Sequence, residues 1–204
     1  MWPGQDGYDY HFQADYVEVW KWMRDVLAEC MQHSSKVRLL VEYKPREPRA
    51  HCFVRSAASV LLLVQNLDNV GVLLDVGHSL QGGENVAEAA ALLASHGKLD
   101  YLHLNDNYGN WDEDLMVGAV HVVAYLELVY WLQRLNYRGW LTLDIFPYRE
   151  DGIKAATQCK AWIQALFKAV DRVGMDAFAA VIQDADACRA VALVRQALMR
   201  KAGG

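Results

Sequence analysis

Two residues whose side chains can take part in chemistry lie at the end of a short apolar run. Residues 37–41 are β-branched and leucine-rich enough to form a buried strand, and Glu42 and Lys44 follow at once. Two apart on an extended segment, their side chains point to the same side, and prolines at positions 45 and 48 prevent a helix from continuing. This arrangement suits a metal-binding carboxylate beside a proton-donating lysine. Taken alone, the segment could also be a solvated charged turn.

Three more apolar runs end in the same way. Residues 69–74, 99–102 and 140–143 each lead into a carboxylate or an imidazole. The four predicted strands deliver these candidate ligands: Glu42, Asp75, His103 and Asp144. In a parallel barrel of alternating strands and helices, the carboxyl ends of the strands converge on one face, where active sites lie. Carboxylates with one imidazole favour a divalent manganese, cobalt or magnesium ion over a structural zinc.

The loop after the third strand predicts a second set of ligands. Asp112 and Asp114 are two apart, so in an extended loop both can chelate one ion. Together with Asp75 and His78 they form a second site that shares Asp75 with the first. Paired ions bridged by one carboxylate imply chemistry on a polyoxygenated substrate. Taken singly, the two loop aspartates could be an ordinary surface pair, and His78 could bond a backbone carbonyl.

Apolar residues recur at helical spacing between the predicted strands. We expect helices over residues 16–30, 58–67, 87–94, 124–135 and 159–170. One helix is thus followed by four repeats of strand and helix, which is an α/β architecture. Residues 176–183 and 185–201 predict two appended helices. We therefore divide the chain into a barrel-type domain of residues 1–174 and a helical extension of residues 175–204.

Composition narrows the class of protein. The 204 residues, 53% of them hydrophobic, can bury a core as one domain, and a formal charge of −5 argues against a nucleic-acid binder. The sequence has neither an apolar run of transmembrane length nor a secretory leader, so we expect no membrane association and a cytoplasmic location. The cysteines at positions 30, 52, 159 and 188 lack paired metal spacing, and we interpret them as reduced packing residues.

Residues 42–48 resemble the Glu-x-Lys-Pro-x-x-Pro signature of xylose isomerases, and Asp75-Val76-Gly77-His78 resembles the next strand-end motif of that superfamily. An aspartate at the shared ligand position, Asp75, together with a histidine at the third strand, His103, is more similar to the rhamnose-isomerase-like branch than to xylose isomerase itself. The resemblance implies a xylose isomerase-type (β/α)8 TIM barrel. This chain supplies about four of its eight βα units, which map onto the second half. The early strands that carry the family's ring-opening histidine and its partner aspartate are missing.

The resemblance also gives roles to individual residues. The two ligand sets would hold two ions, manganese, cobalt or magnesium. Lys44 would polarise the substrate carbonyl, and Asp75 and His78 would act with it in catalysis. Trp2, in a segment similar to the tryptophan-glycine segment after the family's fourth barrel strand, and Trp111 would line the sugar.

The implied reaction is aldose–ketose interconversion of a small-molecule sugar by a 1,2-hydride shift. One alternative is a one-metal sugar epimerase, in which the first ligand set holds an ene-diolate while carboxylates move a proton. Another is a non-catalytic half-barrel association module. Because four parallel strands leave two open edges, we expect either a homo-oligomer, most simply a two-fold homodimer, or a complementary half-barrel as partner.

Overall fold

The computed structural model describes residues 7–33 and 36–199. Its main sheet consists of four strands: β2 (Leu39–Glu42), β4 (Val70–Asp75), β5 (Leu99–Leu104) and β6 (Trp140–Leu143). They are all parallel, in the order β2-β4-β5-β6, which is also their order along the chain. Their carboxyl ends therefore lie at one edge of the sheet, as the sequence predicts.

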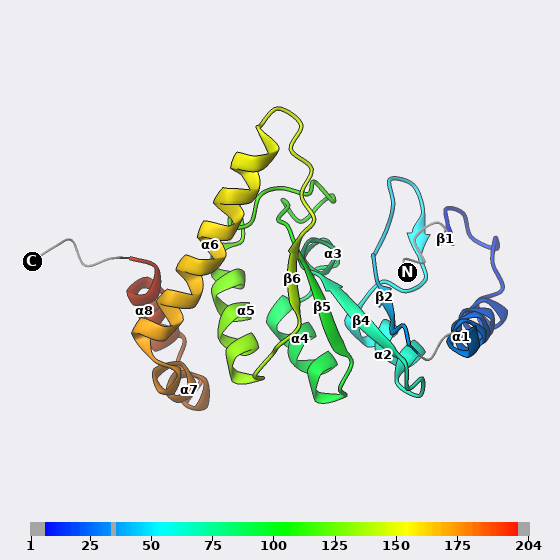
Figure 1. The fold of residues 1–204 in the computed structure, drawn as a ribbon, viewed down its shortest axis with the longest axis horizontal. Helices are drawn as coiled ribbons and strands as arrows, with labels where there is room; N and C mark the ends of the chain where they lie inside the picture. Colours follow the sequence, from blue (N-terminus) through cyan, green and yellow to red (C-terminus); the bar gives the residue numbers. More distant parts are fainter. Residues whose placement is uncertain (1–6, 34–35, 200–204) are drawn as a thin grey trace, which may run out of the picture.

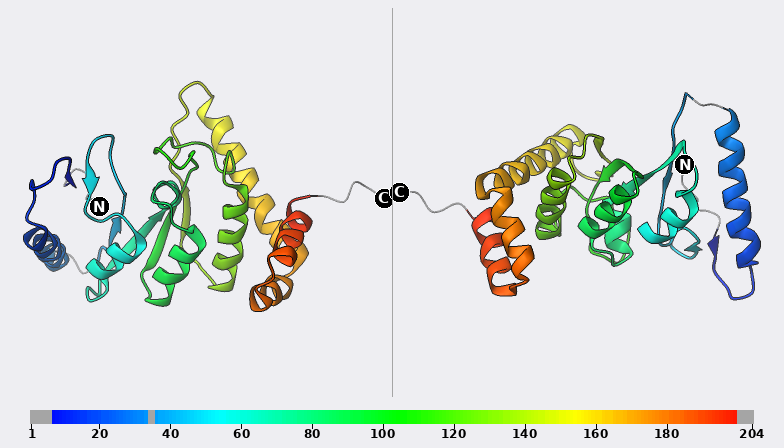
Figure 2. Two further views of the ribbon diagram at one scale, coloured as in Figure 1. Left: turned by 180° about the vertical axis from the view of Figure 1, so that it is seen from behind. Right: turned by 90° about the horizontal axis from the view of Figure 1, so that it is seen from below.

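Helices connect and flank these strands (Figure 1). They are α1 (Tyr16–His33), α2 (Ala57–Val64), α3 (Val76–Gln81), α4 (Val86–Ser95), α5 (Val122–Arg134) and α6 (Gly152–Val173). Figure 2 shows α1 at one end of the molecule and the last two helices, α7 (Met175–Asp184) and α8 (Ala187–Leu198), at the other. The expected helix followed by four strand–helix repeats is confirmed, while the domain boundary at residue 174 stays a prediction.

The core lies between the sheet and its helices. Alternate strand side chains point toward the helices and are buried, among them Val72, Leu74 and Leu102. The intervening side chains, such as Leu73 and Tyr101, lie on the opposite face of the sheet and are only half-buried. The two faces therefore differ: one is packed, and the other corresponds to the inside of a barrel.

Three local features differ from the sequence prediction. The short helix α3 follows β4 without a loop, because the Asp75 carboxylate accepts a hydrogen bond from the backbone N–H of His78 and caps it. A small antiparallel pair joins β1 (Gly7–Tyr8) to β3 (His51–Cys52). Strand β5 extends to Leu104 and so includes His103.

None of the four cysteines, all within the described residues, forms a disulfide. Cys188 is exposed and is not the packing residue we expected.

No helix within the described residues is both long enough and apolar enough to span a bilayer.

The buried face of β4 gives a test of the fold. Leu74 is 0% exposed, so Leu74→Ala should lower the free energy of unfolding by about 2 to 5 kcal/mol, since it removes packed methyl groups and leaves a cavity. Leu62, on the outer side of α2, is 66% exposed, and Leu62→Ala should change that free energy by less than about 0.5 kcal/mol. Urea unfolding followed by circular dichroism measures both. Similar losses in the two variants would contradict the packing described.

Candidate metal centre

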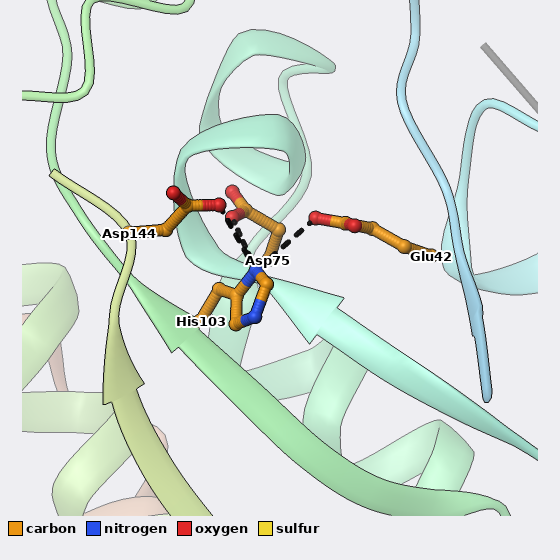
Figure 3. Close-up of side chains that lie close together, drawn as sticks. All are labelled: Glu42, Asp75, His103 and Asp144. Atoms are coloured by element: carbon orange, nitrogen blue, oxygen red, sulfur yellow. Dashed lines mark ion pairs between the residues drawn. The ribbon is translucent and has the colours of Figure 1, made fainter. Parts of the chain in front are cut away.

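Four side chains from the carboxyl ends of the main strands converge on one point (Figure 3). Glu42 ends β2, Asp75 ends β4, His103 lies near the end of β5 and Asp144 follows β6. One ligand atom of each lies within 4.8 Å of those of the other three. The structure thus brings together the complete first ligand set, as expected from strand ends in a parallel sheet.

His103 lies at the middle of this cluster. Its Nδ1 atom is 3.1 Å from Asp144 Oδ2, 3.3 Å from Glu42 Oε1 and 3.6 Å from Asp75 Oδ2. The same nitrogen is buried and makes no well-directed hydrogen bond within the described part of the chain. A buried nitrogen facing three carboxylates fits the donor set of a divalent Mn, Co or Mg ion.

The electrostatics of the cluster support that fit. Burial lowers the pKa of the His103 imidazole, but the carboxylates of Asp144, Asp75 and Glu42 raise it more, to about 12. The contact with His103 in turn lowers the pKa of Asp144. In the metal-free protein the imidazole therefore carries a proton, whose charge offsets part of the surrounding negative charge. A divalent ion bound there would displace that proton.

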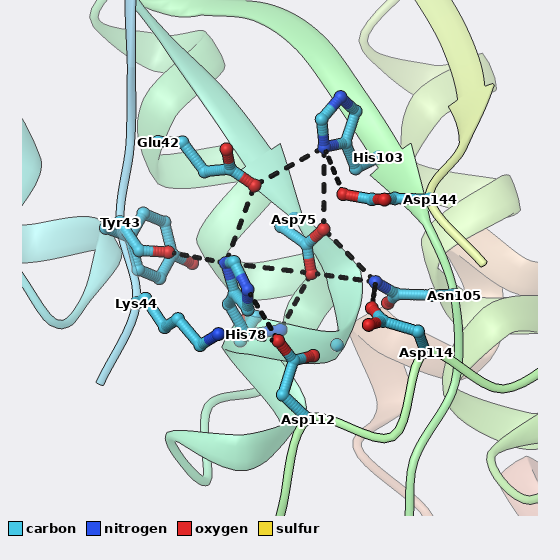
Figure 4. Close-up of polar contacts among 12 residues, drawn as sticks. Glu42, Tyr43, Lys44, Asp75, His78, His103, Asn105, Asp112, Asp114 and Asp144 are labelled. Atoms are coloured by element: carbon cyan, nitrogen blue, oxygen red, sulfur yellow. Dashed lines mark hydrogen bonds and ion pairs between the residues drawn. The ribbon is translucent and has the colours of Figure 1, made fainter. Parts of the chain in front are cut away.

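His78, from the second ligand set, is held on the other side of Asp75 by helix α3 (Figure 4). Its Nδ1 atom is 2.9 Å from the carbonyl oxygen of Tyr43, and its Nε2 atom is 3.2 Å from Asp112 Oδ2. Burial lowers the pKa of His78, but Asp112 and Asp75 raise it to about 9. The backbone contact that was one alternative for His78 is present together with the contact to a ligand candidate.

Asp112 links Lys44 to His78. The Lys44 Nζ atom is 2.8 Å from Asp112 Oδ2 and 3.2 Å from Glu47 Oε1. Burial lowers the pKa of Lys44, but these two carboxylates raise it above its usual value, so the ammonium stays charged. Burial raises the pKa of Asp112, whereas His78 and Lys44 lower it, to about 2. Lys44 thus stands protonated at the edge of the site.

Asp114 completes the second set, but among residues 7–33 and 36–199 no cationic group forms an ion pair with it. Burial and the neighbouring charges of Asp112 and Asp144 raise the pKa of Asp114 to about 7. Its carboxylate accepts a hydrogen bond of 3.3 Å from Asn105 Nδ2, which also lies 3.2 Å from Asp75 Oδ2. Among the described residues, the first set alone forms a close metal-ligand cluster. Within the second set Asp112 contacts His78, but the same oxygen is also engaged by Lys44.

The structure adds Asn105 to the site, a residue that the sequence analysis missed. Asn105 is 1% exposed and joins Asp75 to Asp114. The signal was available, because Asn105 lies two positions after His103 and so points to the same side of an extended segment. Trp111 is 39% exposed in the same loop, and its contact with a sugar stays a prediction. Trp2 lies outside the described residues.

The chain belongs to the xylose isomerase-like TIM barrel family, whose model matches residues 1–166. Curated relatives include the xylose isomerases of Thermus thermophilus, 29% identical over 166 residues, and Streptomyces lividans, 28% identical over 162 residues. Each match covers 76% of this chain and 43% or 41% of the relative, so the chain spans about two fifths of the length of these enzymes.

Solved structures confirm the fold. A D-tagatose 3-epimerase-like protein matches with a TM-score of 0.68 and 22% identity, covering 84% of this chain and 62% of that protein. An L-ribulose 3-epimerase matches with a TM-score of 0.66 and 18% identity, covering 79% of this chain and 58% of that one. The parallel sheet with its flanking helices is therefore part of a TIM-barrel-type fold, as predicted.

The protonated state of His103 makes metal binding measurable. We expect Mn²⁺ uptake near pH 7 to release about one proton from His103 per ion, and the affinity to rise by about tenfold per pH unit, because ion and proton compete. Calorimetry in two buffers of different ionisation enthalpy counts the protons.

Asp75→Asn keeps an oxygen that can cap α3 but removes the charge, so it should lower the Mn²⁺ affinity by about tenfold or more. Asp25, which is exposed on α1, provides the control Asp25→Asn. Wild-type affinity in Asp75→Asn, or no proton release on binding, would show that the cluster is not the metal centre.

Proposed function

We propose that this chain carries the metal-binding half of a sugar isomerase that interconverts an aldose and a ketose by a 1,2-hydride shift. The observation that carries the proposal is the position of Lys44, a buried and charged amine held 2.8 Å from Asp112 beside the metal-ligand cluster. The names of the curated relatives support the same reaction class. The substrate class is a small polyhydroxylated sugar.

Two divalent ions, Mn, Co or Mg, are proposed to bind. The first set, Glu42, Asp75, His103 and Asp144, holds one ion, and the second set, Asp75, His78, Asp112 and Asp114, holds the other. Ions held there would supply Lewis acidity toward the oxygen atoms of the substrate. For the second ion, Asp112 must release at least part of its contact with Lys44, which leaves the ammonium to face the substrate.

Lys44 has the properties that a hydride shift requires of a hydrogen-bond donor. In this reaction, hydride moves between two substrate carbons while negative charge develops on the carbonyl oxygen. A fixed ammonium that donates a hydrogen bond to this oxygen stabilises the transition state, and it need not give up its proton. The raised pKa of Lys44 keeps that proton in place at neutral pH.

A one-metal sugar epimerase is the second candidate, and two observations favour it. Only the first ligand set is gathered into a close cluster among the described residues. Asp114, whose pKa is raised to about 7, is suited to take a proton from a carbon next to a carbonyl, while a second acid on the opposite face of the substrate returns a proton and inverts that carbon. The solved structures of similar fold include proteins named as epimerases, although their low identity supports the fold alone.

A deuterium label on the substrate distinguishes the two reactions. In a hydride shift, deuterium on carbon 2 of the aldose moves to carbon 1 of the ketose and stays in the product. In a proton-transfer reaction, deuterium is lost to water through the enzymatic base. Proton NMR of the product formed in the presence of Mn²⁺ distinguishes them, and complete exchange with solvent would rule out the hydride shift.

The chain is shorter than its curated relatives, and this decides which protein an activity assay must use. Because the chain spans about two fifths of its curated relatives, we propose that turnover needs a closed barrel, completed by a second copy or by a complementary half-barrel. The chain alone should bind Mn²⁺ and show little or no turnover. The kinetic test of Lys44 therefore uses a complete, active enzyme that contains this chain.

In such an enzyme Lys44→Met should keep its metal and lose turnover, since a group that stabilises only developing charge does not hold the ions. The barrier should rise by about 2 to 4 kcal/mol, the usual scale for one such donor. Lys168, which is exposed on α6, gives the control Lys168→Met. Steady-state kinetics with a Mn²⁺ titration measure both quantities. Equal turnover in Lys44→Met and wild type would show that Lys44 has no role in catalysis.

A further inference from the structure

A buried aspartate, Asp106, joins the two ends of the loop between β5 and α5. The proposed chemistry does not use this residue. Asp106 is 0% exposed. Its carboxylate accepts hydrogen bonds from the backbone N–H groups of Asn107 (2.9 Å), Val120 (2.8 Å) and His121 (3.0 Å), and from Nδ1–H of His121 (2.7 Å). The backbone of Asp106 also pairs with that of Leu115, at 2.9 and 2.8 Å.

His121 is committed to this contact at the start of a helix. It occupies the N-cap position of α5, yet its side chain makes no capping hydrogen bond to the helix. A serine, threonine, aspartate or asparagine is the usual residue there, because its oxygen satisfies the free N–H groups of the first turn. The imidazole instead turns back to Asp106, so both ends of the loop meet at one carboxylate.

The segment between Asp106 and Val120 includes residues 107–114, which carry half of the second ligand set. Asp114 has a φ of 49°, a left-handed conformation that a non-glycine residue keeps only when its surroundings hold it there. At the start of the loop, directly after Asp106, the Asn107 side-chain amide donates a hydrogen bond of 2.7 Å to the carbonyl oxygen of Gly77, next to His78. None of the first set, by contrast, lies in the loop.

We propose that Asp106 and His121 form a clamp that positions residues 107–114, and with them Asp112 and Asp114, against Lys44 and His78. Both are positioning residues, because they act on the site through the loop. A buried carboxylate with four donors loses several of them at once when it is neutralised, and the loop then loses the tie between its two ends. The clamp should therefore govern the second ligand set and leave the first set unchanged.

The variants separate the role of the hydrogen bond from the bulk of the side chain. His121→Val removes the imidazole donor, and His121→Asn places an amide N–H close to the position of Nδ1–H. Asp106→Asn is isosteric but presents an NH₂ group to backbone N–H donors. His33, which is exposed at the end of α1, provides the control His33→Val. Urea unfolding of each variant shows whether the fold is kept.

The first readout is amide hydrogen exchange of the metal-free protein. In His121→Val and Asp106→Asn, the amides of residues 107–114 should exchange about tenfold faster or more, while those of β4 and β5 keep their wild-type rates. His121→Asn should stay within about threefold of wild type. Unchanged exchange in the loop, or faster exchange throughout the chain, would overturn the clamp. Should His121→Val fail to fold, Asp106→Asn decides the question.

The second readout is Mn²⁺ binding, which rests on the proposed function. The weaker of two Mn²⁺ affinities should fall about tenfold or more in His121→Val and Asp106→Asn, and the tighter one should change by less than about twofold. His121→Asn should restore the weaker affinity. An equal fall of both affinities would overturn the selective role. If the wild-type protein takes up a single ion, the two-ion function fails, and hydrogen exchange alone decides the clamp.

Discussion

The crowding of carboxylates at the carboxyl edge of the sheet is the constraint on which the rest of the site depends. Parallel strands in register bring Glu42, Asp75 and Asp144 around one point, and the β5–α5 loop adds two more acids. Two imidazoles and one lysine, all with raised pKa, offset this charge. Within the described part of the chain Asp114 has no such cationic partner, and its pKa is raised to about 7. We propose that this concentration of negative charge binds a divalent cation.

Asp75 links the metal centre to the local fold. One of its oxygens accepts the N–H of His78 at 2.8 Å and starts helix α3, while the other faces His103 at 3.6 Å. The position of His78, a candidate for the second set, therefore depends on a ligand of the first. A substitution at this position would act on helix and metal together, which is why a variant that keeps the capping oxygen is the informative one.

The sequence predicted that the four side chains of the first set converge, because the rule behind it is simple: apolar runs form strands, and parallel strands end at one edge. It could not show how loop side chains choose among partners, so the turn of Asp112 toward Lys44 required the structure. Asp106 was missed because its partners come from residues 107 to 121 and share no spacing rule. The two-residue strands β1 and β3 were missed because they are too short for periodicity.

Helices stand outside both outer strands of the main sheet, with α1 before β2 and α6 after β6. In a barrel of alternating strands and helices, each pair of neighbouring strands is covered by one helix. If two copies of this chain paired β6 of one with β2 of the other, α6 of the first copy and α1 of the second would both have to cover that strand pair. The two helices would therefore occupy the same position. A ring closes without this competition when the missing arc begins and ends with a strand, and so contributes one helix fewer than its number of strands.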